Sequence, residues 1–461
     1  MNGSGVERGY AGHDGRDAAL SRKYRLLRIG AAIAALVCAF LWSAHAVHAL
    51  EISFRSFSSS AAIGPPADEF GAKLASLSLI ALGKDGQVKF TRAAPTPAVP
   101  KEFGNIVAAV GAGGPLAGGP GFDAAYISGS ELDPAWGFAY NSGVPFGPEF
   151  DEFIGFLYGK SVDGGKATGL DLLQELLDKR GRNVVAIPIV GSSQQGSGYF
   201  MKPVGDAGPT PGIGLSGLCE QNWTFRYLPP AQYVLDRACD SLVAAGAIPK
   251  KNIKFVTAVA GKGSLVKAVA DNQLQAFEFA TPLDDASQLF GLPEGNPGTA
   301  GTRYLHFPGW HQQFLVTYMI INKRVWGMMS PAQQGLVMSV GRDHVISSYG
   351  ENLRQQGAKL QEILAANAHD PDPAHSMVLV QWPQSDLAKL RDATIQFLDD
   401  RVSDTKLGEE DRKDYGRVLE ALRAYVSANN GYWKVRGVPP ALRFQGWRDA
   451  DGKKTWDQDL R

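Results

Sequence analysis

The chain has 461 residues, 44% of them hydrophobic and 20% charged, so it is long enough for two or three domains with hydrophobic cores. Its 46 lysines and arginines balance its 46 aspartates and glutamates. This balance excludes the overall basic charge that draws proteins to nucleic acids or to anionic membranes. We therefore expect a globular protein with no nucleic-acid partner.

The first fifty residues differ in composition from the rest of the chain. Basic residues between Arg22 and Arg28 precede an uncharged apolar run over 29–42, and small residues follow over 44–49. This order is typical of a cleaved secretory signal peptide, because the apolar run is shorter than the ~20 residues that a membrane-spanning helix needs. An uncleaved membrane anchor is the alternative. We expect residues 1–49 to form a signal peptide and the mature protein to be exported.

Two cysteines, Cys219 and Cys239, remain after removal of this segment. In an oxidising compartment they can form a disulfide that ties a loop to the helix that follows it. They can equally be two separate buried thiols. Because the chain contains no CxxC pair, neither a zinc site nor a redox site is indicated.

Strands and helices alternate through the first half of the mature chain. The hydrophobic pattern predicts strands over 52–57, 88–92 and 122–127, and helices over 66–80 and 101–110. Leucines at helical spacing over 170–177 then lead to Gly181, which can end the helix, and to a continuous apolar strand over 184–190. This order is typical of an α/β protein with a covered sheet.

The segment 223–279 repeats this order. We predict strands over 223–227, 253–259 and 274–279. We also predict a helix with Pro230 in its first turn, an amphipathic part over 233–245 and its end at Gly246, and a second helix that Ser264 caps and that extends to Asn272. The β-α-β-α-β order implies a mostly parallel sheet with right-handed crossovers. Ligands of such sheets bind beyond the carboxyl ends of the strands, where Arg226 and Glu278 are expected.

From Ser330 the pattern changes to one long helix. Residues 330–333 form a capping box with Pro331 in the first turn, and no strong helix breaker precedes Asn367. At about 1.5 Å per residue this helix exceeds ~50 Å, so it can brace two lobes. Further helices are predicted over 385–402 and 409–428.

No catalytic signature is evident in the chain. Residues 191–195 lack the last glycine of a GxSxG elbow, and HExxH does not occur. His306 and His311 lie five residues apart across Pro-Gly, which is not the spacing of a helical metal pair, so hydrogen-bonded cleft or core histidines are preferred over zinc ligands. An exported hydrolase that uses Asp284 or Asp285 with His311 is the alternative function.

Five segments occur in an order that resembles one protein family. They are NSGVPFG at 141–147, VGSSQQGSGYF at 190–200, FR at 225–226, FEFATPLDD at 277–285 and FPGWH at 307–311. Together they resemble the DctP-type periplasmic solute-binding proteins of TRAP (tripartite ATP-independent periplasmic) transporters. Within that family the chain is most similar to the branch that binds 2-oxo acids and related carboxylates, and the similarity covers about 122–367.

This resemblance implies an α/β fold of two lobes, joined by crossing strands and a long bracing helix, that closes over a ligand. It implies a periplasmic receptor rather than an enzyme, which delivers a small organic acid to TRAP membrane permease subunits and is a monomer or homodimer. We expect the first lobe over 50–222 and 281–340, the second over 223–280 and 341–402, and a C-terminal helical extension over 403–461.

The resemblance also implies the residues of the ligand site. Arg226 matches the family's carboxylate-binding arginine, and a planar guanidinium fits a carboxylate with two donors. Gln195 matches a glutamine that precedes an aromatic residue, and Glu278 and Phe279 match a Glu-Trp pair. The predicted ligand-binding residues are Arg226, Gln195, Glu278, Phe279, Trp310, Tyr199 and Gln312.

This interpretation requires no cofactor. Two hypotheses can explain how the charge of Glu278 is balanced, and the first is a sodium or calcium ion at the ligand site. An anionic ligand near Glu278 meets a like charge unless a cation lies between them, and Gln195, Glu278 and Phe279 are the candidate cation ligands. Phenylalanine replaces the family's tryptophan at 279, so only its backbone carbonyl could serve. The other hypothesis is that a basic neighbour neutralises Glu278, or that Glu278 is protonated.

Overall fold

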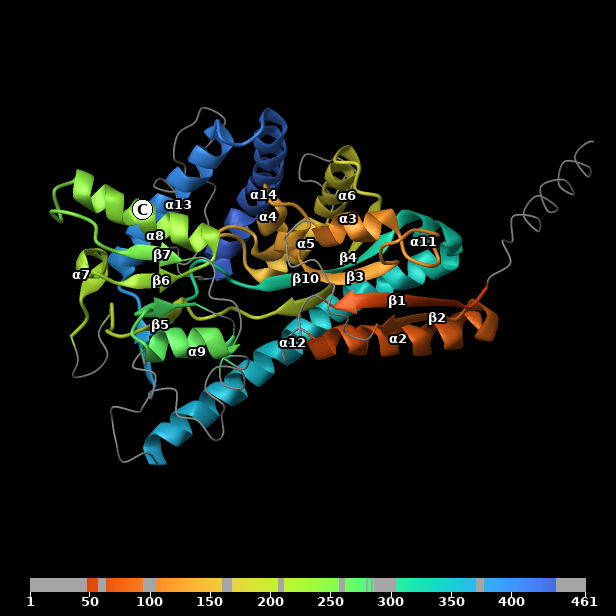
Figure 1. The fold of residues 1–461 in the computed structure, drawn as a ribbon, viewed down its shortest axis with the longest axis horizontal. Coiled ribbons are helices and arrows are strands. Elements are labelled where there is room, and N and C mark those ends of the chain that lie inside the picture. The colour runs from red at the N-terminus through yellow and green to blue at the C-terminus, as the bar shows by residue number, and fades with distance from the viewer. Residues whose placement is uncertain are drawn as a thin grey trace, which may run out of the picture.

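The computed structural model describes residues 48–56, 64–93, 105–159, 168–205, 211–256, 262–278, 281–282, 285, 304–369 and 377–436. They form two helix-covered β-sheets, side by side along the molecule, with one long helix running past both (Figure 1). The predicted two-lobed α/β fold is confirmed. Residues 1–47 of the expected signal peptide lie outside the described residues. None of the described helices has the length and apolar character needed to cross a membrane.

The first sheet has five strands in the order β2-β1-β3-β10-β4. β1 (Leu50–Ser56), β2 (Val88–Arg92) and β3 (Ala124–Ser128) correspond to the three predicted strands and run parallel. β10 (Leu315–Asn322) lies between β3 and β4 (Val184–Ser192) and runs antiparallel to both, so this sheet is mixed. Every residue of β10 is buried, and the sequence analysis missed it because a strand covered on both faces shows no alternation.

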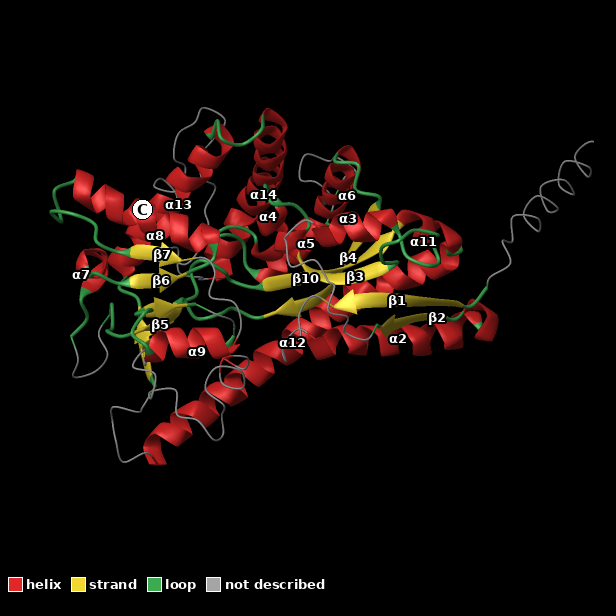
Figure 2. Ribbon diagram, in the orientation of Figure 1, coloured by secondary structure: helices red, strands yellow, loops and turns green. Residues whose placement is uncertain are grey.

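Helices cover both faces of this sheet (Figure 2). α2 (Gly64–Leu82) packs on one face, where its Phe70 and Leu74 share a core cluster with Ile52, Met319 and Ile321. The other face is covered by α3 (Asn105–Ala112), α4 (Gly137–Ser142), α5 (Phe150–Tyr158) and α6 (Gly169–Lys179). α6 ends just before Gly181, whose φ of 64° favours glycine, so the predicted helix stop is confirmed. α11 (Lys323–Met328) follows β10 directly.

The second sheet has six strands in the order β11-β9-β5-β8-β6-β7. β6 (Thr224–Arg226), β7 (Lys254–Val256) and β8 (Ala276–Phe277) are parallel, as predicted. β5 (Gly198–Phe200) and β9 (Tyr304–Phe307) pair here, with β11 (Val378–Gln381) at the edge. The expected lobe boundaries place β5 and β9 in the first lobe. The structure differs because each strand pairs with distant neighbours, not with the strand nearest to it in sequence.

Three helices accompany this sheet: α7 (Gly214–Glu220), α8 (Pro229–Ala244) and α9 (Lys262–Ala270). α8 begins with two prolines and is followed by Gly246 at a φ of 67°, so its predicted limits are confirmed. α9 begins at Lys262, which places Ser264 inside the helix. The prediction that Ser264 caps this helix is therefore wrong, because a glycine such as Gly263 is tolerated within a first turn and does not end the helix.

Two short segments cross between the sheets. Residues 193–197, the first crossing segment, lead from β4 to β5. Residues 308–314, the second crossing segment, lead from β9 back to β10. The peptide between Phe307 and Pro308 at the start of the second segment is cis. The predicted crossing strands are thus confirmed.

The predicted long helix is α12 (Pro331–His369), with 39 residues. Its capping box is formed as expected: the Ser330 N–H donates to Gln333 Oε1 at 2.8 Å, and the Gln333 N–H donates to Ser330 Oγ at 3.3 Å. Val337 near its start packs in the core of the first lobe, and Ile363 near its end packs in a core cluster of the second lobe. One rigid element therefore spans both lobes.

The middle of α12 contacts the connections between the lobes. Asn352 Oδ1 accepts hydrogen bonds from the Ser193 N–H at 2.9 Å and the Ser193 hydroxyl at 2.8 Å. One turn further, Gln356 Nε2 donates to Thr281 Oγ1 at 2.8 Å. All four residues are buried. The helix thereby positions the first crossing segment and the chain that follows β8.

The C-terminal helices contact both lobes. α13 (Gln384–Ser403) packs against α8, while α14 (Glu409–Arg436) packs against α5 and α6. The fully buried carboxylate of Asp414 on α14 bonds Lys179 Nζ at 2.7 Å and Arg180 Nη2 at 2.9 Å. The predicted helical extension over 403–461 is therefore part of the packed fold as far as residue 436.

The two cysteines left open by the sequence form a disulfide. Cys219 on α7 and Cys239 on α8 are both fully buried and are joined sulfur to sulfur, 20 residues apart. The bond links two helices on the outer side of the second lobe, away from the crossing segments (Figure 1). It agrees with an exported protein, since disulfides persist in oxidising compartments.

We predict that the double substitution Cys219→Ala and Cys239→Ala lowers the free energy of unfolding by about 3 kcal/mol, because the bond limits the entropy of the unfolded chain. Denaturant unfolding of the oxidised wild type and the double variant measures the difference. Wild type unfolded in the presence of a reductant should behave like the variant. Equal unfolding midpoints for oxidised wild type and variant would contradict the prediction.

Candidate ligand-binding site

Arg226 and Glu278 meet at the carboxyl edge of the second sheet. Arg226 is the last residue of β6 and Glu278 follows β8, so the parallel pairing of these strands brings both side chains to one edge. Arg226 Nη1 lies 3.0 Å from Glu278 Oε2 and also donates to the Glu278 backbone carbonyl. The predicted position of both residues at strand ends is confirmed.

Burial controls the charge of this pair. The Glu278 side chain is 1% exposed and that of Arg226 is 15% exposed. Loss of water raises the pKa of Glu278 to about 7, although the positive charge of Arg226 acts to lower it. Glu278 is therefore near the midpoint of its titration at neutral pH, which agrees with the hypothesis of a protonated or arginine-neutralised carboxyl group.

The two crossing segments lie beside this pair. A side chain at Gly309 would come within 2.0 Å of the Gln195 carbonyl oxygen, so the close approach of the two segments requires glycine there. The His311 ring stacks on Tyr227, the residue after Arg226, with centroids 6.0 Å apart and an interplanar angle of 11°. The crossing segments thus reach the carboxyl end of β6.

Tyr227 contacts both crossing segments. Its hydroxyl donates to the Ser197 carbonyl in the first crossing segment at 2.5 Å. Burial, and then the negative charge of Glu278, raise the pKa of Tyr227 well above its ordinary value. Trp310 stacks on Phe146 on the far side of the second segment, with centroids 5.8 Å apart. One continuous set of contacts therefore runs from β6 through the crossing segments to the first lobe.

Buried polar atoms without a protein hydrogen-bond partner gather in the same region. Among the described residues, those in the crossing segments and at Glu278 are Gln195 Oε1, Glu278 Oε1, Trp310 Nε1, both ring nitrogens of His311, Gln312 Oε1 and Gln313 Oε1, while others lie elsewhere in the fold. A buried polar group without a partner costs about 1–3 kcal/mol, and native proteins contain few of them. Such a concentration where two lobes meet is the arrangement expected of a polar ligand site.

The structure does not bring all the predicted ligand-binding residues to one place. Arg226 and Glu278 pair at the carboxyl edge of the second sheet. Gln195, Trp310 and Gln312 lie in the two crossing segments, which approach each other at Gln195 and Gly309, and both Trp310 and Gln312 are 1% exposed. Tyr199 lies instead in a core cluster of the second lobe, where its ring stacks on Phe277 at 5.1 Å and its hydroxyl donates to Asp285 at 2.9 Å. Phe279 lies outside the described residues.

The two histidines of the FPGW segment have different environments. His306 is a core residue, as predicted: its Nε2 accepts from the Val204 N–H at 2.9 Å and its Nδ1 lies 2.9 Å from the Tyr304 carbonyl. His311 is buried, as expected of a cleft or core histidine, but neither of its ring nitrogens has a hydrogen-bond partner among the described residues. The structure places it in the candidate site, and the polar run His311, Gln312 and Gln313 between two aromatic residues is the signal that could have indicated it.

One of the two acids of the hydrolase alternative has another partner. Asp285 bonds Tyr199 rather than His311, and Asp284 lies outside the described residues. Among the described residues no three His, Cys, Asp or Glu side chains come together in a way that could hold a metal ion. Any cation here would depend on amide and backbone oxygens beside Glu278.

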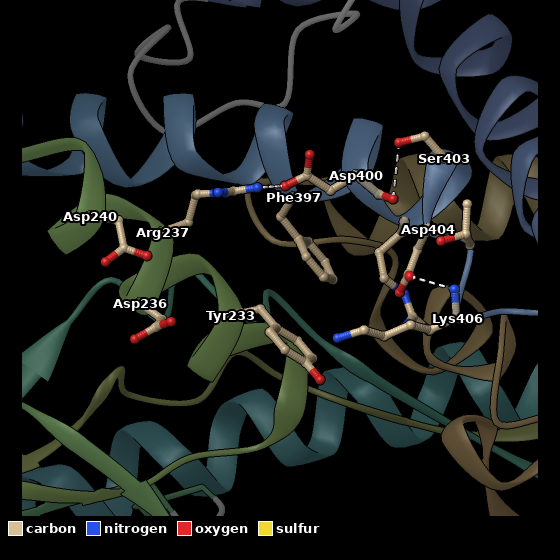
Figure 3. A pocket seen from close by; sticks show the side chains of 11 residues that line it. Tyr233, Asp236, Arg237, Asp240, Phe397, Asp400, Ser403, Asp404 and Lys406 are labelled. Atoms are coloured by element: carbon tan, nitrogen blue, oxygen red, sulfur yellow. Dashed lines mark hydrogen bonds and ion pairs between the residues drawn. The ribbon is translucent and has the colours of Figure 1, made fainter. Parts of the chain in front are cut away.

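A large cavity lies elsewhere in the described part of the chain. It has a volume of about 490 Å³ and lies between α8 and α13, where Tyr233 and Phe397 stack at 5.7 Å (Figure 3). Its acidic groups already have partners, since Arg237 pairs with Asp400, and Lys251 bonds Asp236 at 2.7 Å and Asp240 at 2.6 Å. A smaller cavity of about 80 Å³ lies at the crossing segments beside Trp310 and Gln313. The position of partnerless polar atoms, not volume, marks the candidate site.

No protein-family model and no curated protein sequence matches the chain. Its fold is similar to that of a TRAP transporter solute-binding protein from Bordetella bronchiseptica, with a TM-score of 0.59 and 15% identity over 84% of this chain and 95% of that one. That protein was solved with calcium and picolinate in one active site of a dimer.

Two further TRAP periplasmic solute-binding proteins show the same likeness. The protein from Colwellia psychrerythraea, with calcium and pyruvate bound, has a TM-score of 0.57 and 13% identity over 84% of this chain and 99% of that one. The protein from Pseudoalteromonas atlantica, with sodium and pyruvate bound, has a TM-score of 0.56 and 14% identity over 85% and 99%. This chain therefore has the fold of TRAP solute-binding proteins.

We predict that the free energy of unfolding of the ligand-free protein falls as pH rises, because Glu278 loses its proton. Its folded-state pKa of about 7 exceeds the ordinary 4.5, so the native state holds the extra proton between these values. Between pH 4.5 and 7 wild type should lose up to about 3 kcal/mol relative to Glu278→Gln, at ~1.4 kcal/mol per pKa unit. Urea unfolding of both proteins at pH 5 and pH 8 measures this, and parallel pH profiles would contradict it.

Proposed function

We propose that the chain is a periplasmic receptor of a TRAP transporter that binds a small organic carboxylate and delivers it unchanged to the membrane permease. The observation that carries the proposal is the partly buried Arg226 at the end of β6, together with the buried polar atoms of both crossing segments that lack a hydrogen-bond partner among the described residues. The shared fold with TRAP solute-binding proteins supports it, and so do the basic, apolar and small residues of the N-terminus.

Arg226 supplies the charge that a carboxylate needs. Arg226 bonds Glu278 through Nη1. A guanidinium carries five N–H donors on three nitrogens, and its planar shape matches the two oxygens of a carboxylate. A charge-assisted bond of this kind gains strength in a site that excludes water.

The arrangement suits binding better than catalysis. The guanidinium, the amides of Gln195 and Gln312, and the indole N–H of Trp310 can donate to or accept from a ligand without forming a covalent bond to it. The position between two lobes, with α12 bonded to the connections, supports closure around the ligand. We propose that the closed receptor, as a monomer or homodimer, is the form that meets the permease.

We predict that Arg226→Lys weakens binding of a small carboxylate such as pyruvate by about 2–5 kcal/mol, roughly thirty-fold to several thousand-fold, because a lysine cannot reproduce the two-pronged contact. Titration calorimetry on the folded variant measures the affinity. Arg237→Lys, in the large cavity of Figure 3, is the matched control and should bind like wild type. Affinity within threefold of wild type for Arg226→Lys would remove Arg226 from the site.

We further propose that a sodium or calcium ion accompanies the ligand. The residues fit a hard cation, because Glu278 Oε1 and Gln195 Oε1 are buried oxygen acceptors without a protein partner among the described residues. When bound, the ion would offset the repulsion between Glu278 and the ligand carboxylate. The Phe279 carbonyl is the third oxygen that the sequence suggests. The relatives solved with calcium or sodium beside picolinate or pyruvate support this proposal.

We predict that pyruvate affinity falls at least tenfold after dialysis into choline buffer with a chelator, and returns when sodium or calcium is added back. Glu278→Gln should bind without this ion dependence, because the amide removes the charge that the ion balances. Titration calorimetry under the three buffer conditions gives the comparison. If neither ion changes the affinity of wild type while Glu278→Gln binds as well or better, Glu278 belongs to the scaffold.

A further inference from the structure

His311 is held in a fixed orientation inside the candidate site. It is 1% exposed, its ring lies nearly parallel to that of Tyr227, and the Trp310 ring lies at 71° to it with centroids 5.6 Å apart. The neighbouring backbone is anchored, because the Gln312 N–H donates to the Gly309 carbonyl at 2.9 Å and the Phe146 N–H donates to the Trp310 carbonyl at 2.8 Å. Neither aromatic contact uses a ring nitrogen.

Both nitrogens of this ring lack a partner among the described residues. Burial lowers the pKa of His311 to about 3, so the imidazole is neutral and carries one donor and one acceptor. His306, five residues earlier and equally buried, uses both of its nitrogens for backbone hydrogen bonds. The same residue type in the same motif is thus satisfied by protein at one position and not at the other.

We propose that His311 is the specificity-determining residue of the site, and that its imidazole hydrogen-bonds a second polar group of the ligand beyond the carboxylate held by Arg226. The ligand class is then a small organic acid with an oxo, hydroxyl or ring-nitrogen substituent, in preference to an apolar acid of the same shape. This inference rests on the proposed carboxylate receptor. Its geometric basis is that the His311 ring stacks on Tyr227, which follows Arg226 in the chain.

The test uses pairs of acids that differ in one polar atom. Pyruvate is compared with methacrylate, which has a methylene group in place of the oxo oxygen, and picolinate with benzoate, which lacks the ring nitrogen. Wild type should bind the polar member of at least one pair about 10- to 100-fold more tightly, the value of one buried hydrogen bond. His311→Phe should bind both members of that pair equally, at about the affinity of wild type for the apolar member.

Two controls separate this role from a structural one. Without ligand, His311→Phe should melt at the same temperature as wild type or higher, because it removes partnerless polar atoms while keeping the ring stack. A structural histidine would show a lower melting temperature. His311→Gln, which keeps one donor and one acceptor, should restore part of the discrimination.

The outcomes of this test distinguish failure of the His311 inference from failure of the receptor proposal. If wild type binds none of the four acids and Arg226→Lys changes nothing, the receptor proposal and this inference both fail. If wild type prefers the polar acid and His311→Phe keeps the same ratio, the preference comes from another group, such as a bound cation, and the inference alone is overturned. Equal binding of both members of each pair by wild type overturns it as well.

Discussion

The buried pair of Arg226 and Glu278 constrains the rest of the structure, because removing two charges from water costs several kcal/mol unless neighbouring groups compensate. Parallel pairing of β6 with β8 brings the two side chains within 3.0 Å. Glu278 is almost fully buried there, whereas the side chain of Arg226 stays 15% exposed. The raised pKa of Glu278 shows that the compensation within the protein is incomplete, which leaves a role for a ligand or a cation.

The connections between the lobes explain how such a site is both covered and able to form. Two crossing segments join the sheets, and α12 bonds the first of them through Asn352. α13 and α14 add a further connection on the other side, secured by the buried Asp414. A lobe movement would therefore turn about a few short segments while the long helix keeps its length. This arrangement suits closure by small rotations.

The two cavities show why chemistry indicates the site better than size. The groove between α8 and α13 is larger, but three of its aspartates already form salt bridges with Arg237 and Lys251 of the protein itself. The crossing segments enclose less space, yet they contain indole, imidazole and amide groups whose hydrogen bonds are not made within the described protein. Partners for these groups must come from a ligand, from water or from an ion.

The sequence by itself determined the elements whose pattern is local: β1, β2, α6, α8 and the capped start of α12 follow from the spacing of their own apolar and capping residues. It also placed Arg226 and Glu278 at strand ends. Only the tertiary structure decided that β5 and β9 join the second sheet, that β10 lies between β3 and β4, and that Cys219 bonds Cys239. It also decided that Tyr199 bonds Asp285 while His311 bonds no described residue. The physical reason is that periodicity depends on neighbours within one turn or strand, whereas the partner of a polar atom can lie a hundred residues away.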